Sequence, residues 1–345
     1  MTYDEIIHEV TSGLTGDNEK DFKYLFGQAE KYKDHEYGKE ITRAIGRMIY
    51  EVLPPEKRGE FDQLFNNHLK GTESIIEEVK FQMYKKDFNK ALDIFQSYIK
   101  DLNDEKDVYP DDKKSEYHCF QNFLEELLYK VIYQPTKEIR RAPEDIAQLY
   151  FFYGNLLLEM KKYDEALIAL TKAEKYNAVN TDIKFEKGEI YKIRKDWENY
   201  LEINRKCLEC AYSNNAIVRA YRNISYYFSD IGEYNNAISM IFLSMHFDKG
   251  STIAQSEIAY ISDKTGKKVE RPDFETIKKL LDEKNIQLGP NPLVLEICTT
   301  IGSQIKDDQP EAAIFFFSII YELTENEGIK NLLTELQIKV SNDKK

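Results

Sequence analysis

The amino-acid sequence predicts an all-α solenoid, a row of helical hairpins in which each hairpin packs on its neighbours. Apolar residues recur at steps of three and four along most of the chain, which is the period of one helix face. The segment 147–180 is followed by a second copy, in which Gly188 repeats Gly154 and Trp197 repeats Tyr163, each 34 residues later. A repeat of that length is typical of solenoids. No segment alternates apolar and polar residues between turn signals, so strands are not expected.

The composition excludes some classes of partner. Lys and Arg together number 48 and Asp and Glu 61, which gives a net charge of −13. Surfaces that bind nucleic acid or anionic membranes need a basic footprint, so neither partner is expected. The start MTYDEIIHEV does not resemble a signal peptide, and no apolar run reaches 18 residues. We therefore expect a cytoplasmic protein without a membrane span.

Helices of the N-terminal half are expected over residues 36–53, 73–86, 88–102 and 118–133. Pro54 and Pro55 end the first of them, because a residue before proline is disfavoured in the helical region. The segment 101–117 is charged and contains a proline, so it is expected to be a loop, and Pro135 and Pro143 bracket another break. None of these breaks has the length or composition of a flexible linker. One elongated domain with irregular joints is therefore expected.

The C-terminal half continues the repeat. A third unit fits around Tyr221, Phe228, Tyr234, Ala237 and Ile241, with a three-residue slip from the strict period. The segments 286–292 and 307–310 contain prolines and are expected to be turns. The apolar cluster 312–321 is too short to cross a membrane and is expected to be a buried helix.

The repeat resembles the tetratricopeptide repeat (TPR). That family's motif has a glycine in the first helix, an aromatic residue before the second and small residues within the second; Gly154, Tyr163, Ala166 and Ala173 match it. The next unit is degenerate, with Tyr200 and Cys207 in place of the small residues. Weaker units fit around Phe88, Ala91 and Phe95, with Val79 for the glycine, and around Ala312 and Phe316.

The resemblance implies a right-handed α-α superhelix with atypical terminal helices. Residues 1–70 would form an N-terminal helical cap, residues 71–325 the TPR-like superhelix, and residues 326–345 a C-terminal capping helix and tail. In such a superhelix the first helix of each repeat lines the concave groove. The groove residues that the resemblance implies are Gln148, Phe151, Asn155, Phe185, Glu189, Lys192, Arg219, Arg222 and Tyr226.

Two alternatives remain open for these groove residues. Phe151 and Phe185 can equally pack within or between repeats. Some family members bind acidic C-terminal tails through a clamp of basic residues and asparagines. Asn155 and Arg219 would fit such a clamp, but Phe151 and Glu186 do not, and neither does Asn223.

Motifs for catalysis, metals or cofactors are weak. Cys207 and Cys210 form a CxxC without a second pair of ligands, so they are expected to be structural cysteines. The five histidines have no metal-ligand spacing, and the segment 263–268 lacks the pattern of a phosphate-binding loop. The acidic segment 101–112 lacks the glycine and glutamate of a calcium-binding loop. No cofactor and no enzymatic activity are expected.

The leading hypothesis is a non-enzymatic scaffold that binds a protein segment or peptide in the groove. Apolar contacts from Phe151 and Phe185 would anchor the segment, and Lys192, Arg219 and Arg222 would pair with its charges. The alternative is an intracellular receptor for a small signalling peptide that controls a regulator. Many such receptors carry an N-terminal DNA-binding domain, and residues 1–70 show no basic recognition helix.

Overall fold

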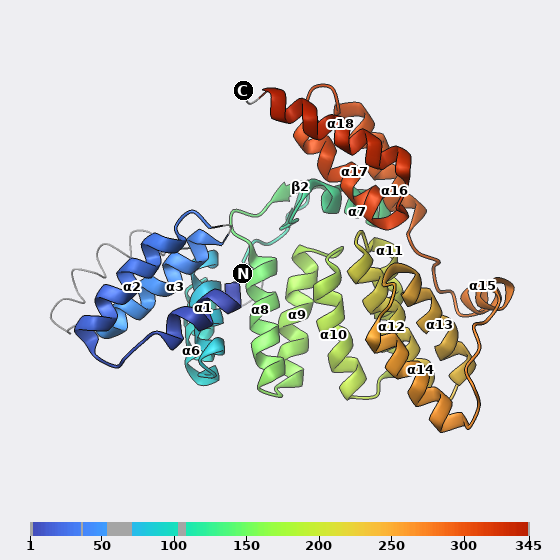
Figure 1. Ribbon diagram of the computed structural model, residues 1–345, viewed down its shortest axis with the longest axis horizontal. Helices are drawn as coiled ribbons and strands as arrows, with labels where there is room; N and C mark the ends of the chain where they lie inside the picture. The colour runs from blue at the N-terminus through green and yellow to red at the C-terminus, as the bar shows by residue number, and fades with distance from the viewer. Residues whose placement is uncertain (1–2, 36, 54–70, 103–107, 344–345) are drawn as a thin grey trace. The chain divides into compact units, whose positions relative to one another are not determined.

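The computed structural model describes residues 3–35, 37–53, 71–102 and 108–343 (Figure 1). Helices joined as sequential hairpins dominate these residues, so the all-α fold class predicted from the sequence is confirmed. The contacts within the chain divide into two compact units. Unit 1 consists of residues 1–110 with 142–162, and unit 2 of residues 111–141 with 163–345.

Unit 1 contains helices α1 (Tyr3–Ser12), α2 (Asn18–Tyr32), α3 (Gly38–Val52), α5 (Thr72–Tyr84), α6 (Phe88–Asp101) and α8 (Ile146–Glu159). Helix α3 packs against α1, α2 and α5, while α8 packs against α5 and α6. The helices expected over 36–53, 73–86 and 88–102 are present. Ala91 and Phe95 of α6 are fully buried, as the repeat pattern predicts. Pro54 and Pro55, at which the first expected helix was to end, lie outside the described residues.

Unit 2 contains the longer series of helices. These are α7 (Phe123–Tyr133), α9 (Tyr163–Tyr176), α10 (Thr181–Ile193), α11 (Trp197–Cys210), α12 (Asn214–Asp230), α13 (Tyr234–Phe247), α14 (Thr252–Thr265), α15 (Phe274–Glu283), α16 (Pro292–Ile305), α17 (Pro310–Thr324) and α18 (Glu327–Asp343). From α9 to α14 each helix packs on the next, and α16, α17 and α18 pack in the same sequential way. Ala166 and Ala173 of α9 are fully buried, so they form the smooth stripe that the repeat motif predicts.

The same turn recurs after the first helix of several hairpins. A residue in the left-handed region (Lys86, Lys161, Lys195 or Gly232) ends the helix, with φ between 55° and 80°. The amide of the next residue donates to the carbonyl five residues back, at 2.8–2.9 Å in all four turns. This is the bond of a Schellman motif, which satisfies carbonyls at the end of a helix. An aromatic residue (Phe88, Tyr163, Trp197 or Tyr234) then begins the next helix. The repeat is therefore visible in the backbone as well as in the sequence.

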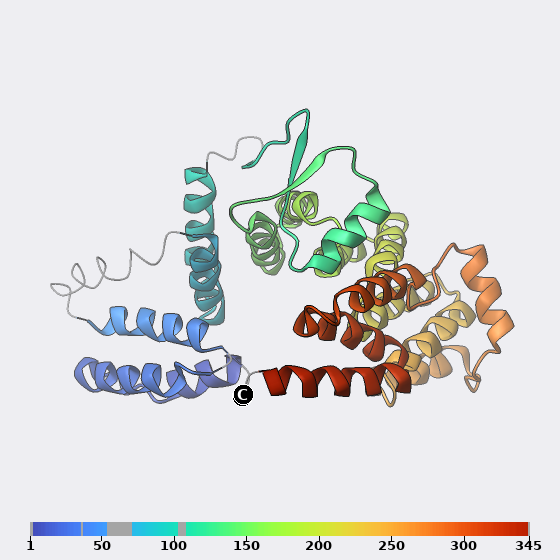
Figure 2. The same ribbon diagram turned by 90° about the horizontal axis from the view of Figure 1, so that it is seen from above.

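The prediction that strands are absent is wrong. Strands β1 (Ser115–His118) and β2 (Glu138–Arg141) pair in parallel, with Ser115 opposite Glu138 and His118 opposite Arg141. Figure 2 shows them side by side, connected through α7. Four residues are too few to show the alternation by which a strand is recognised, and a parallel partner lies beyond a crossover that local sequence does not reveal. The expected loop at 101–117 therefore ends in a strand.

The expected helix at 118–133 begins later than predicted, at Phe123. The side chain of Asn122 accepts a hydrogen bond from the Glu125 amide at 3.1 Å, which caps the first turn. His118 and Phe120 precede the helix, and their rings stack with centroids 5.0 Å apart.

The helix expected over 312–321 is confirmed as part of α17, in which Ala313, Phe316, Phe317 and Ile320 are buried. It packs between α16 and α18. Among the described residues, none of the helices combines the length and apolar character required to span a bilayer.

Candidate functional site

One exposed face of helices α10, α12 and α14 carries most of the predicted groove residues. Positions three, four and seven apart lie on the same side of a helix. In each helix, three residues with this spacing lie on one face. They are Glu189, Lys192 and Ile193 of α10, Arg219, Arg222 and Tyr226 of α12, and Ile253, Glu257 and Tyr260 of α14. We call these nine residues the α10–α12–α14 surface. Tyr226, Ile193, Ile253 and Tyr260 are exposed apolar residues on it, between 41% and 55% accessible.

The three basic residues of this surface already have acidic partners in the chain. Nη2 of Arg219 donates to Oε1 of Glu186 at 3.0 Å. Nη2 of Arg222 donates to Oδ2 of Asp248 and to the Ser251 hydroxyl, each at 2.5 Å.

Lys192 also has a partner within the chain. Its Nζ lies 3.3 Å from Oε2 of Glu189 and 4.6 Å from the centroid of the Tyr226 ring. A carboxylate from a binding partner would have to compete with these contacts to pair with any of the three bases.

A cluster of aromatic residues lies beside these charges. The ring of Trp197 lies 5.8 Å from that of Tyr200, 6.1 Å from that of Tyr226 and 6.2 Å from that of Tyr227. The rings of Tyr200 and Tyr226 are 6.5 Å apart and meet edge to face. Such contacts fix the rings in place, so Tyr226 is held on the surface by the two residues at the start of α11.

The hydroxyl of Tyr200 is buried and has no hydrogen-bond partner within the part of the chain that the structure describes. Tyr200 itself is fully buried. Its pKa lies well above the usual range of tyrosine, first because of burial and then because of the negative charge of Glu189. A buried hydroxyl without a partner is uncommon in folded proteins and is a place where water or a ligand group can bind.

Glu257 of α14 is a second unsatisfied group. Its side chain is partly buried, and Oε2 is fully buried without a hydrogen-bond partner among the described residues. Burial raises the pKa of this carboxyl group, while the positive charge of Arg222 opposes the rise. Its negative charge also contributes, after burial and the charge of Glu189, to the raised pKa of Tyr200.

Phe185 of α10 is buried, with 1% of its area accessible, and the guanidinium carbon of Arg219 lies 4.5 Å from its ring centroid. Its burial agrees with the alternative interpretation that it packs between helices. Phe185 and Arg219 also line a hollow of about 380 Å³ near the beginnings of α10 and α12.

The other predicted groove residues, Gln148, Phe151 and Asn155, lie on α8 of unit 1. All three are partly buried. The ring of Phe151 packs edge to face on that of Phe152, with centroids 5.3 Å apart. Oδ1 of Asn155 is buried and lacks a hydrogen-bond partner among the described residues.

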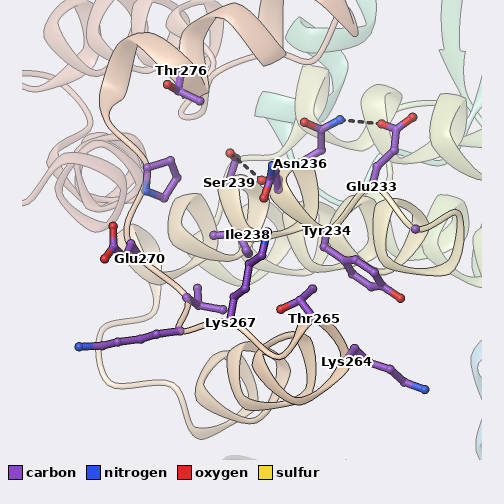
Figure 3. Close-up of a pocket in the computed structure, with 15 residues that line it drawn as sticks. Glu233, Tyr234, Asn236, Ile238, Ser239, Lys264, Thr265, Lys267, Glu270 and Thr276 are labelled. Atoms are coloured by element: carbon purple, nitrogen blue, oxygen red, sulfur yellow. Dashed lines mark hydrogen bonds between the residues drawn. The ribbon is translucent and has the colours of Figure 1, made fainter.

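A larger hollow of about 860 Å³ lies between α13 and the segment that follows α14 (Figure 3). Lys267 extends into it toward α13, whereas Lys264 points away. Gly266, with φ +64°, ends α14 within the segment 263–268. Of the buried polar atoms without a partner in the described part of the chain, none belongs to a residue that lines this hollow. The α10–α12–α14 surface therefore has the stronger signs of a binding site.

The cysteines are free and buried. Burial raises the pKa of Cys210 to about 11 and that of Cys207 well above its usual value. A reactive or metal-binding cysteine needs a lowered pKa, so these values agree with a structural role. Within the described ranges, no group of three or more histidine, cysteine or acidic side chains is arranged to hold a metal ion.

Sequence reasoning missed Trp197, Tyr200 and Glu257 as members of this region. A signal existed for Tyr200, because a large residue stands where the repeat motif has a small one. Glu257 lies on α14, beyond the third recognisable unit, and no motif pointed to it. Its significance comes from the missing partner, which only the folded chain reveals.

Comparison with known proteins gives little. No protein-family model matches the chain, and comparison with curated protein sequences gives no match. Among solved structures, the chain is similar to a chain in the crystal structure of the APC/C hetero-tetramer Cut9-Hcn1. The identity is 11% and the TM-score 0.24, over 94% of this chain and 67% of that one. A TM-score of this size is too low to bear on fold or function.

Proposed function

We propose that this protein is a non-enzymatic scaffold of degenerate TPR-like hairpins that binds a segment of another protein. The observation that carries the proposal is the set of unsatisfied polar atoms at the α10–α12–α14 surface. The Tyr200 hydroxyl, Nε of Arg222 and Oε2 of Glu257 are each buried without a hydrogen-bond partner among the described residues. Native structures rarely leave such atoms unpaired, so these three are candidate contacts for a ligand.

The exposed side chains around these atoms suit a polypeptide ligand. Tyr226 and Tyr260 offer aromatic rings, and Ile193 and Ile253 offer aliphatic surface, on three neighbouring helices. Apolar anchors mixed with a few hydrogen-bonding groups are the usual basis of peptide recognition.

We further propose a cytoplasmic location, which the free cysteines support, because disulfides are typical of oxidising compartments.

The TPR-like assignment extends to the division of the chain. We propose that residues 1–70 act as an N-terminal cap, 71–325 as the repeat region and 326–345 as a C-terminal cap. The four matching Schellman turns at the ends of α5, α8, α10 and α12 support the repeat region.

The test is affinity purification from the native host, with mass spectrometry of the recovered proteins. The bait is compared with a double variant, Tyr226→Ala with Tyr260→Ala, and with Ile168→Ala as a control. Ile168 is an exposed apolar residue of α9, 63% accessible and outside the α10–α12–α14 surface. The proposal predicts proteins that the wild type and the control recover and the double variant does not. Equal recovery by all three baits would place the binding site elsewhere.

A further inference from the structure

The charges of the α10–α12–α14 surface do not balance. Arg219, Arg222 and Lys192 are neutralised by Glu186, Asp248 and Glu189. Within the described residues, Glu257 has neither an ion pair nor a hydrogen bond. The positive charge that opposes the rise in its pKa comes from Arg222, whose guanidinium is already bound to Asp248 and Ser251. One partly buried carboxylate is therefore left without compensation.

An uncompensated carboxylate in such a place is unfavourable for the free protein. Burying a charge without a partner destabilises the fold, and the carboxyl group responds by holding its proton more tightly. A positively charged group placed against Glu257 would remove this penalty. A negatively charged group would increase it, and the net charge of −13 would add long-range repulsion.

The neighbouring groups also suit a cation. The unpartnered Tyr200 hydroxyl has an oxygen that can accept an N–H hydrogen bond. Cations bind favourably over aromatic faces, and three such contacts already lie at the surface. Lys192 lies over the ring of Tyr226 and Arg219 over that of Phe185. The third contact is on α14, where Nζ of Lys264 lies 5.6 Å from the ring centroid of exposed Tyr260, one turn from Glu257.

We propose that Glu257 receives the ammonium or guanidinium group of a lysine or arginine side chain in the bound segment, and that the Tyr200 hydroxyl accepts a second hydrogen bond from that group. This inference rests on the proposed function, since it names the chemistry of the segment. It reverses the expectation from the sequence, in which basic residues of the groove would pair with acidic groups of the partner. The basic residues form ion pairs within the chain, and the carboxylate of Glu257 is available to the ligand.

The experiment is a selection from a random twelve-residue peptide library displayed on phage, with purified full-length protein at pH 7.5. Parallel selections use Glu257→Gln and the control Glu335→Gln. Glu335 is an exposed residue of α18, so its substitution makes the same change in net charge away from the surface. Selected peptides are then measured by isothermal titration calorimetry. Peptides from the wild-type selection should carry lysine or arginine at one fixed position, and their affinity should fall at least about tenfold in Glu257→Gln and remain unchanged in Glu335→Gln.

The other outcomes are distinct. Enrichment of acidic peptides, or basic peptides that bind Glu257→Gln as tightly as wild type, would overturn this inference and leave the proposed function standing. Failure to select any peptide that the Tyr226→Ala, Tyr260→Ala variant weakens would contradict the proposed function itself. Spermidine is titrated separately as a free amine. Spermidine binding that is lost in Glu257→Gln, without peptide enrichment, would overturn the assignment to a protein side chain.

Discussion

Arg222 of α12 is bound to Asp248, with 2.5 Å between Nη2 and Oδ2. This pair decides the chemistry of the α10–α12–α14 surface, because it fixes Arg222, whose charge lowers the pKa of Glu257 against the effect of burial. Glu257 consequently keeps a buried oxygen without a partner among the described residues. In the sequence this surface has both basic and acidic residues. In the fold the basic residues are paired within the chain, which leaves a carboxylate without an ion pair, a hydroxyl without a hydrogen bond and several aromatic faces.

Replacing Glu257 with glutamine should increase stability at neutral pH. Burial raises the pKa of Glu257 above 4.5, so the folded chain holds this proton more tightly than the unfolded chain. The carboxyl group therefore lowers stability as pH rises from 4.5 through the raised value, and the loss is complete above it. Arg222 of α12 and Tyr200 of α11 are the groups that interact with it. In urea unfolding, the free energy of unfolding of Glu257→Gln should increase relative to that of wild type between pH 4 and pH 7.5. The control Glu335→Gln should show no such increase. A pH-independent difference would refute this reasoning.

Replacing Tyr200 with phenylalanine should separate binding from folding. The substitution removes a buried hydroxyl that has no partner among the described residues and keeps the ring that packs on Trp197 and Tyr226. We expect a melting temperature equal to or above that of wild type, since removal of an unsatisfied buried group does not destabilise the fold. Affinity for a selected basic peptide should fall severalfold. Tyr200→Ala, in contrast, should lose about 3–5 kcal/mol through the cavity it leaves. A marked drop in stability for Tyr200→Phe would show that the hydroxyl has a structural partner.

Glu125 should be essential for anchoring the β1–α7–β2 segment to the ends of α9 and α11 within unit 2. It is buried and accepts hydrogen bonds from Asn177 at 2.7 Å, from the Gln121 amide at 2.8 Å and from the Tyr212 hydroxyl at 3.1 Å. Glu125→Ala should destabilise the protein by about 3 kcal/mol, because these donors would be left buried and unpaired.

The neighbouring residue Glu126 is the matched control for this prediction. Among the described residues it pairs with Lys130, one turn along α7, in a partly exposed site. Glu126→Ala should therefore change stability by about 0.5 kcal/mol or less. Urea unfolding monitored by circular dichroism measures both variants, and equal effects would contradict the anchoring role.

The cysteines should be unreactive in the folded protein. Cys207 and Cys210 are at most 2% accessible, and burial raises the pKa of Cys298 to about 12 and that of Cys210 to about 11. At pH 8 almost none of these thiols is ionised, and the thiolate is the reactive form. Ellman's reagent should therefore react slowly with native protein and rapidly after denaturation. Fast reaction of two thiols in native protein, lost in a Cys207→Ser, Cys210→Ser variant, would show that these two cysteines are reactive.

The hairpins could be predicted from sequence because their determinants are local. Ala166 and Ala173 pack where the repeat motif has small residues, and Phe88, Tyr163 and Trp197 begin the second helices as expected. Each hairpin turn is completed within six residues, by a left-handed residue and one Schellman bond. Periodicity and spacing contain that information.

The strands and the site depend on contacts that sequence spacing does not contain. Strands β1 and β2 are four residues each and pair across α7, so neither has a signal of its own. The charges of Arg219 and Arg222 are visible in the sequence, but their partners Glu186 and Asp248 lie 33 and 26 residues away. Glu257 could not be predicted from the sequence, because the absence of a partner is visible only in the folded chain.

The most direct test of the central claim is a double-mutant cycle measured by isothermal titration calorimetry. Wild type and Glu257→Gln are each titrated with a selected peptide and with a version in which norleucine replaces its conserved lysine. Norleucine keeps the side-chain stem and removes the charge. The account predicts a coupling energy of about 1.5–3 kcal/mol between Glu257 and the lysine, within the range measured for close charge pairs across interfaces. Additive losses, with a coupling energy of about zero, would show that the lysine does not bind at Glu257.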